Sequence, residues 1–198
     1  MVFNFVDNRS KNIFDHLLVL LSLEDMGGKL RMPISTVLMQ ADIFYGIDKD
    51  GIESIAKICQ ERTYREGQII FKENSSGNEL YIIAEGEVKI LLDPSMVSDQ
   101  EDARSEERVI TTLRRGQSFG EIALVDQGIR SATARSASKQ THLLVIPRDK
   151  ILSLCEEDPR LGYRLMRNLA ADLSMKLRGT DFQIRDRLLH DDRSSSKS

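Results

Sequence analysis

The chain has 198 residues, of which 40% are hydrophobic and 30% charged, as is typical of a globular protein that folds without a disulfide or metal. Its formal net charge of −3 provides no general attraction to nucleic acid or to an anionic membrane. The two cysteines, Cys59 and Cys155, lie in apolar-periodic stretches, so we expect buried free thiols in a reducing compartment.

The most apolar N-terminal stretch, residues 13–23, contains Asp15 and His16 and is shorter than the ~20 residues of a membrane-spanning helix. The residues before it include Asp7, and no small-residue cleavage site follows promptly. We therefore expect a cytoplasmic protein with no membrane insertion.

Helical spacing dominates the N-terminal part of the chain. Residues 1–37 are predicted to form a helical appendage, in which Gly27-Gly28 ends the apolar run of helical spacing. Docking on the main domain is the favoured interpretation of this appendage, and a partner-binding helix is the alternative. A second helix is predicted from Asp48, which is a typical N-cap residue, with Ile52 and Ile55 on its apolar face.

From Thr63 to Pro147 the pattern changes to short runs rich in Ile, Val, Leu and Tyr. This spacing predicts an antiparallel sandwich or barrel. Glycines fall between the runs, and we interpret them as turn residues: Gly67, Gly77, Gly86 and Gly116. The acidic stretch at 93–108 has almost no large apolar residue, which predicts a mobile hairpin loop whose charge is solvated.

After Pro147 the helical period returns. One apolar stripe marks a helix that begins near Pro159: Leu161, Leu165, Leu169, Leu173 and Leu177. Gly179 is the type of residue that commonly follows a helix, so we expect the helix to end there. Thr180 and Gln183 then form a capping-box pattern that predicts a second short helix.

Residues 119–136 carry the clearest chemical pattern in the chain. Gly120 opens a predicted helical turn whose unpaired amide N–H groups would attract an anion. Arg130 adds a permanent cation with a planar fork that suits two phosphate oxygens. Glu121 would be repelled by a phosphate unless sugar hydroxyls donated to it. Together these residues predict a nucleotide ligand.

Residues 119–132 resemble the phosphate-binding cassette of cyclic nucleotide-binding domains, the β-roll family of catabolite activator protein and protein kinase A regulatory subunits. The family pattern, Phe/Ile-Gly-Glu-x-Ala/Gly-Leu followed by a spacer and Arg-Ser/Thr/Ala-Ala, is met in full. The similarity extends over about residues 38–178 and includes the glycine-punctuated run at 69–88. Asn74 departs from the pattern, because the family commonly has glycine there.

The resemblance implies an α+β fold, with an antiparallel, jelly-roll-like β-roll flanked by N-terminal and C-terminal helices. We expect the β-roll with its leading helix at residues 38–158 and lid or hinge helices at 159–190. A polar tail would follow at residues 191–198, without a helix-turn-helix.

The resemblance also implies the ligand contacts. Arg130 would neutralise the exocyclic phosphate oxygens, and Glu121 with the Gly120 backbone would hold the ribose 2′-hydroxyl. Ser131 would add a hydroxyl near the phosphate. The expected ligand-binding set is Gly120, Glu121, Ile122, Ala123, Arg130, Ser131 and Ala132.

The nature of the base is less well defined by the sequence. Within the family a Thr after the arginine tends to accompany cGMP, so Ser131 favours cAMP. In catabolite activator protein, a Thr-Ser pair on the helix after the β-roll completes the contacts to the base. Lys176 and Leu177 occupy the matching places here, so those hydrogen bonds cannot be carried over and the selectivity stays open.

The function predicted from these features is that of a cyclic nucleotide sensor with no metal or other cofactor. Movement of its C-terminal helix would pass the signal to a partner protein or to a second copy of the chain. The alternative is a constitutive interaction scaffold with a vestigial pocket. We expect no enzyme activity, because His16, His142 and His190 are isolated from one another. We expect no DNA binding, because the C-terminal arginines are spread along helices.

Overall fold

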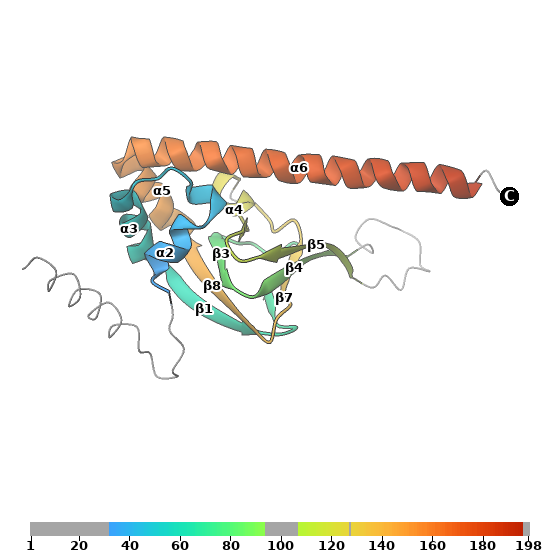
Figure 1. Ribbon diagram of the computed structural model, residues 1–198, viewed down its shortest axis with the longest axis horizontal. Helices are drawn as coiled ribbons and strands as arrows, with labels where there is room; N and C mark the ends of the chain where they lie inside the picture. The colour runs from blue at the N-terminus through green and yellow to red at the C-terminus, as the bar shows by residue number, and fades with distance from the viewer. Residues whose placement is uncertain (1–31, 94–106, 127, 196–198) are drawn as a thin grey trace, which may run out of the picture.

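The computed structural model describes residues 32–93, 107–126 and 128–195 (Figure 1). Most of the predicted 1–37 appendage, most of the acidic 93–108 loop and the end of the polar tail lie outside these residues. In the described part, two four-stranded sheets are flanked by helices at both ends of the chain. The predicted α+β class, an antiparallel β-roll with flanking helices, is confirmed.

Three short helices lead into the sheets: α2 (Ile34–Met39), the 3-10 helix η1 (Asp42–Phe44) and α3 (Lys49–Ile58). The predicted cap of α3 is confirmed, since the Asp48 carboxylate accepts a 2.8 Å hydrogen bond from the amide of Gly51. Ile52 and Ile55 lie on its buried face, as their spacing predicts.

The first sheet has the strand order β1-β8-β3-β6 and the second β2-β7-β4-β5, and all paired strands are antiparallel. The first contains β1 (Gln60–Arg65), β3 (Glu79–Glu85), β6 (Ser118–Phe119) and β8 (Gln140–Pro147). The second contains β2 (Ile69–Phe71), β4 (Glu87–Leu92), β5 (Arg108–Arg114) and β7 (Thr133–Ser136).

Strand β3 divides the core into two hydrophobic clusters. Leu80 and Ile82 point to the helices and pack with residues of α3, α5 and α6. Tyr81 and Ile83 alternate with them and pack with residues of the second sheet. A strand that is buried on both faces is expected to be continuously apolar, which explains the run Leu80–Ile83.

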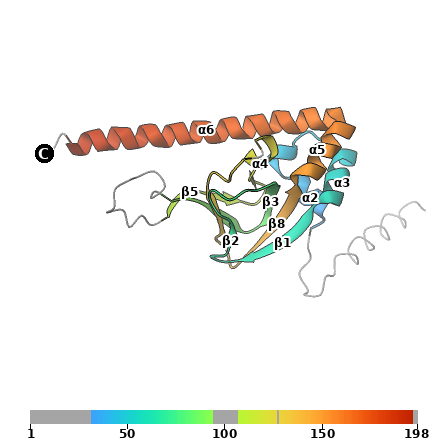
Figure 2. The ribbon, with the colours of Figure 1, turned by 180° about the vertical axis from the view of Figure 1, so that it is seen from behind.

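Two helices follow the sheets, α5 (Arg148–Glu157) and α6 (Pro159–Ser195). Leu161, Leu165 and Leu169 of α6 are buried against the helical side of the core, as the predicted stripe requires. Figures 1 and 2 show that α6 crosses the β-roll beside α4 and then extends past it. The stripe therefore leaves the core, and Leu177 is 62% exposed.

The predicted helix end at Gly179 is wrong, because α6 continues without a break to Ser195. A glycine inside a helix costs only about 1 kcal/mol relative to alanine, which is too little to end a helix among good helix formers. Thr180 does not cap a second helix; its hydroxyl donates to the carbonyl of Lys176 at 3.1 Å, one turn earlier.

Candidate functional site

A two-residue strand positions the start of the 119–132 segment. In β6, Phe119 pairs with Tyr81 of β3, and the chain then turns at Gly120 with a φ of +76°. A side chain at position 120 would meet both this left-handed conformation and an Arg130 nitrogen, whose distance from an added Cβ would be 2.5 Å. The turn leads into α4 (Ile122–Val125), with Glu121 at its N-cap.

Arg130 is buried inside the β-roll, with 5% of its surface exposed. Its Nη1 donates to the carbonyl of Gly120 at 3.2 Å and its Nη2 to the carbonyl of Glu79 at 3.1 Å. The guanidinium carbon lies 4.2 Å from the centre of the Phe71 ring, at cation–π distance. The Nε of Arg130 is buried and has no hydrogen-bond partner within the described part of the chain.

A buried guanidinium with a free N–H group is electrostatically costly. Burial lowers the pKa of Arg130, and the charges of Tyr81, Glu79 and Glu121 oppose this shift. An arginine nonetheless keeps its charge at neutral pH. The arrangement therefore leaves a permanent buried cation with one unsatisfied donor, which an anion would stabilise.

Glu79 links Arg130 to a second charged group. Its carboxylate accepts hydrogen bonds from Arg62 at 2.7 Å and from the Tyr81 hydroxyl at 2.5 Å. Burial alone would raise the pKa of Glu79, but these hydrogen bonds and the Arg62 and Arg130 charges together lower it. The side chain that lies beneath Arg130 is thus held as a carboxylate.

The turn before β3 holds Arg130 by its backbone. The amide of Arg130 donates to the carbonyl of Ser75, and its carbonyl accepts from the amide of Asn74, both at 2.8 Å. Asn74 has a φ of +62°, a left-handed conformation that asparagine tolerates better than most residues. The departure from the family glycine at this position therefore keeps the conformation for which glycine is used.

Lys176 of α6 reaches the site from a distant part of the sequence. Its Nζ lies 2.6 Å from Oε1 of Glu121, 2.7 Å from Oδ2 of Asp172 and 3.0 Å from the carbonyl oxygen of Ser118. Burial alone would lower the pKa of Lys176, but the Glu121 and Asp172 carboxylates outweigh it and raise the pKa above its ordinary value. The Glu121 side chain is only 8% exposed, so this ion pair is largely shielded from solvent.

The other predicted site residues surround this centre. Ile122 and Ala123 form the first turn of α4, where backbone N–H groups have no acceptor within the helix. Ser131 is exposed and Ala132 is half-buried. The structure thus places the Arg130 guanidinium against the Gly120 carbonyl, next to Glu121, although the ion-pair partner of Glu121 is Lys176.

The contacts of four further residues at this site were not predicted from the sequence. Phe71 and Tyr81 were assigned only to strands and Gly77 only to a turn. Lys176 was placed where the family has its base contacts, but no contact was carried over to it. The aromatic rings and Lys176 approach Arg130 and Glu121 by tertiary packing across 49 to 59 positions, which no local pattern reports.

Comparison with known proteins agrees with this geometry. The family model for the cyclic nucleotide-binding domain matches residues 61–158. These residues belong to the cyclic nucleotide-binding domain family. The matched region contains both sheets and the whole 119–132 segment, and α6 follows directly after it.

Curated relatives in this family include transcription regulators. The chain is 31% identical over 142 residues to the cyclic AMP receptor protein of Thermus thermophilus, covering 72% of this chain and 60% of that protein. It is 27% identical over 155 residues to the CRP-like cAMP-activated global transcriptional regulator of Mycobacterium tuberculosis, covering 78% and 63%. The chain therefore spans about 60% of the length of these two relatives.

Solved structures share the fold. The catabolite activator protein of Thermus thermophilus matches with a TM-score of 0.60 and 30% identity, over 73% of this chain and 62% of that one. A cyclic nucleotide-binding domain from Methylobacillus flagellatus matches with a TM-score of 0.66 and 20% identity, over 78% and 82%. The second likeness supports the fold alone.

The described residues contain neither a metal-binding cluster nor a membrane-spanning helix. Within residues 32–93, 107–126 and 128–195, His, Cys, Asp and Glu side chains form no group of three that could hold a metal ion. No helix in the same residues is both long enough and apolar enough to span a bilayer.

Proposed function

We propose that this chain binds a cyclic nucleotide, cAMP in preference to cGMP, between the 119–132 segment and α6. The observation that carries the proposal is the buried guanidinium of Arg130 with its unpartnered Nε. A cyclic phosphate would supply both the missing acceptor and the compensating charge. Membership of the cyclic nucleotide-binding family supports the same ligand class.

The remaining contacts follow from the positions of the other residues. Glu121 and the Gly120 backbone would hold the ribose 2′-hydroxyl, and the first amides of α4 would donate to the phosphate. Ser131 would donate a hydroxyl near the phosphate, and Ala132 would leave space beside it. The proposed set is that expected from the sequence: Gly120, Glu121, Ile122, Ala123, Arg130, Ser131 and Ala132.

The proposed output is a change in the position of α6. This helix touches the site through Lys176 and also extends beyond the β-roll, where a partner or a second copy could contact it. A ligand shifts such a helix only if it has different affinities for the two helix positions. The bound nucleotide would be released unchanged, so chromatography should recover it intact after prolonged incubation with the protein.

One observation favours the scaffold function as a second candidate. The Glu121 carboxylate, which would hold the ribose, is already paired with Lys176 of the same chain. A permanently occupied carboxylate would suit a constitutive interaction module. Thermal denaturation separates the two functions, because a ligand at 100 times its Kd adds about 2.7 kcal/mol of stability. No shift with cAMP or cGMP would favour the scaffold.

Calorimetric titration of Arg130→Lys tests the phosphate contact. Lysine keeps a positive charge but loses the planar fork, and it disturbs the packing on Phe71 less than alanine would. We expect a loss of about 2–5 kcal/mol, or roughly 30- to 5,000-fold in affinity for cAMP. Arg114→Lys is the matched control, because the Arg114 side chain is 74% exposed and pairs with Glu87 on β4. Equal affinity in both variants would refute the proposed contact.

A further inference from the structure

We propose that Lys176 is an autoinhibitory latch, which holds α6 against Glu121 until a ribose hydroxyl competes for that carboxylate. This inference rests on the proposed nucleotide-binding function. In the structure, Glu121 is paired with an ammonium from α6, and the proposed ligand would use the same carboxylate. Nucleotide binding and the release of α6 would then both follow from one competition for the Glu121 carboxylate.

The ammonium of Lys176 contacts three oxygens. It donates hydrogen bonds to Oε1 of Glu121 and to the Ser118 carbonyl, and it forms an ion pair with Oδ2 of Asp172 at 2.7 Å. A ribose hydroxyl that approached Glu121 would compete with the Lys176 ammonium for that carboxylate. The Glu121 side chain is 8% exposed and that of Lys176 35%, so the contact is shielded and cannot be treated as a weak surface pair.

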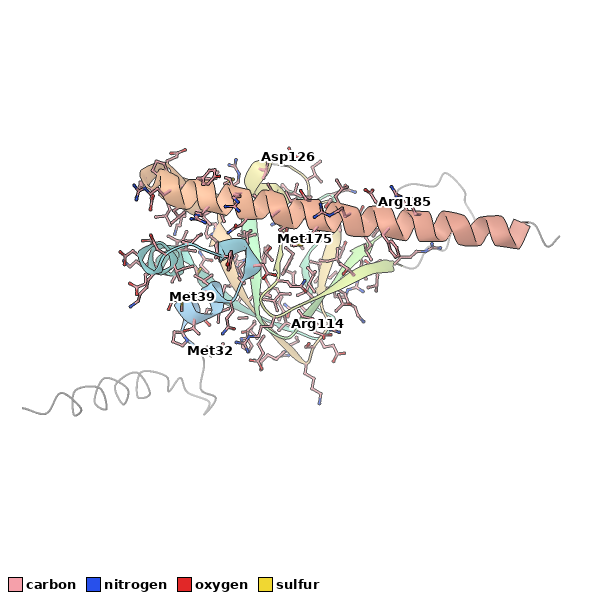
Figure 3. The ribbon with its side chains drawn as sticks, turned by 45° about the horizontal axis from the view of Figure 1, so that its top comes forward. Met32, Met39, Arg114, Asp126, Met175 and Arg185 are labelled. Carbon is pink, nitrogen blue, oxygen red and sulfur yellow. The ribbon has the colours of Figure 1, made fainter. Side chains whose placement is uncertain are left out.

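The place of Lys176 along α6 makes it suitable as a latch. Leu173 still packs against the core, whereas Leu177 is 62% exposed. The Lys176 ammonium connects α6 at this position to Glu121 and to the Ser118 carbonyl of the β-roll. Figure 3 shows Met175 where α6 lies over the β-roll and Arg185 farther along the helix. Lys176 therefore fixes α6 to the β-roll where the leucine stripe leaves the core.

Asp172 allows the latch to open without leaving an unpaired charge. It lies one turn before Lys176 on the same helix, and the two side chains are 2.7 Å apart. When Glu121 turns to a ribose, the ammonium can stay with Asp172 and move away with the helix. Asp172 therefore keeps the ammonium paired in the open position, whereas Glu121 pairs with it only in the closed one.

The latch predicts that Lys176→Met and Asp172→Asn have opposite effects on the affinity for cAMP. Lys176→Met removes the ammonium but keeps most of the side-chain length, so Glu121 is free for the ligand. We expect cAMP to bind roughly 5- to 150-fold more tightly, the usual range of such couplings. Asp172→Asn removes the alternative partner and should weaken cAMP binding by roughly fivefold or more. Lys150→Met is the control, because Lys150 is an exposed lysine on α5.

The ligand 2′-deoxy-cAMP tests whether the competition takes place at Glu121. This analogue has no 2′-hydroxyl to offer the carboxylate, so Lys176→Met should tighten its binding much less than that of cAMP. Calorimetry of the wild-type protein and the three variants with both ligands supplies the comparison. Weaker or unchanged cAMP binding in Lys176→Met, or equal tightening of both ligands, would overturn the latch.

Hydrogen exchange without ligand provides a readout that does not depend on the proposed function. Release of the latch should speed amide exchange in α6 after residue 176 in Lys176→Met, but not in Lys150→Met. Unchanged exchange would overturn the latch even if cAMP binds. If the wild-type protein binds no cyclic nucleotide, the proposed function fails, and the latch as a ligand-operated device fails with it.

Discussion

The side chain of Arg130 occupies the space that any side chain at position 77 would need. A Cβ added to Gly77 would lie 2.1 Å from Nε and 2.4 Å from Cζ of Arg130. Turn formation alone, which is how the sequence was interpreted, does not explain this glycine. Gly77 allows the guanidinium to lie directly on the backbone.

Gly77→Ala should therefore disturb the site without touching a proposed ligand contact. The methyl group would push Arg130 from its place between the carbonyl oxygens of Gly120 and Glu79. We expect a loss of about 1–3 kcal/mol in stability, as is typical of overpacking. Cyclic nucleotide affinity should fall to a similar extent as in Arg130→Lys. Denaturant unfolding and calorimetry measure the two effects, and a variant with wild-type affinity would contradict this role for Gly77.

Gly179→Ala should have the opposite effect on stability. An added Cβ at position 179 meets nothing within 4 Å, and the residue lies inside α6. Alanine has the higher helix propensity, so the free energy of unfolding should rise by about 0.5–1 kcal/mol if α6 unfolds with the rest of the domain. Circular dichroism during urea unfolding measures this change in the free energy of unfolding. Destabilisation would indicate instead that α6 is interrupted at Gly179.

Glu79→Gln should make stability less dependent on pH in the acid range. The folded-state pKa of Glu79 is lowered, so its carboxylate contributes stability above the unfolded-state pKa near 4.5. That contribution is lost as the pH falls through the lower folded-state value. At pH 7 the variant should be less stable by roughly 1.5–3 kcal/mol, the range for hydrogen bonds to a charged group. The difference should shrink as the pH falls below about 4.5, and a constant difference down to pH 3 would contradict it.

Cys59 should be unreactive in the folded protein. Burial, assisted by the charge of Glu61, raises the pKa of the Cys59 thiol to about 12. Because the thiolate is the reactive form, a disulfide reagent at pH 8 should modify Cys59 only after denaturation. Mass spectrometry of the peptide that contains Cys59 identifies the modification. Fast modification under native conditions would show that the thiol is exposed or activated.

Much of the fold could be predicted because its signals are local. The Asp48 cap, the glycine-separated apolar runs and the leucine stripe from Leu161 each report on their own element. Strand β6 has only two residues, and β1 is mostly polar, so neither shows a clear apolar alternation. Gly179 gave a wrong helix end because its local cost is smaller than the gain from continuing the helix.

The candidate site likewise contains residues that a local sequence pattern identifies and residues that only tertiary structure brings to the site. Glu121 and Arg130 lie nine positions apart, so a single sequence pattern was sufficient to place both in the candidate site. Lys176 follows Glu121 by 55 positions, and its contact depends on where α6 crosses the β-roll. The stacking of Arg130 on Phe71 depends likewise on how the two sheets pack. Such relations arise from tertiary structure, so the sequence alone did not predict them.

The Nε–H signal of Arg130 provides the most direct test of the account. In protein labelled with ¹⁵N at arginine Nε, the signal of Arg130 is the one that disappears in Arg130→Lys. Saturating cAMP should move this signal strongly downfield, because a phosphate oxygen becomes the acceptor that Nε lacks, whereas adenosine should not move it. If cAMP leaves the signal unchanged at concentrations that saturate binding, or does not bind at all, the proposed role of Arg130 is wrong.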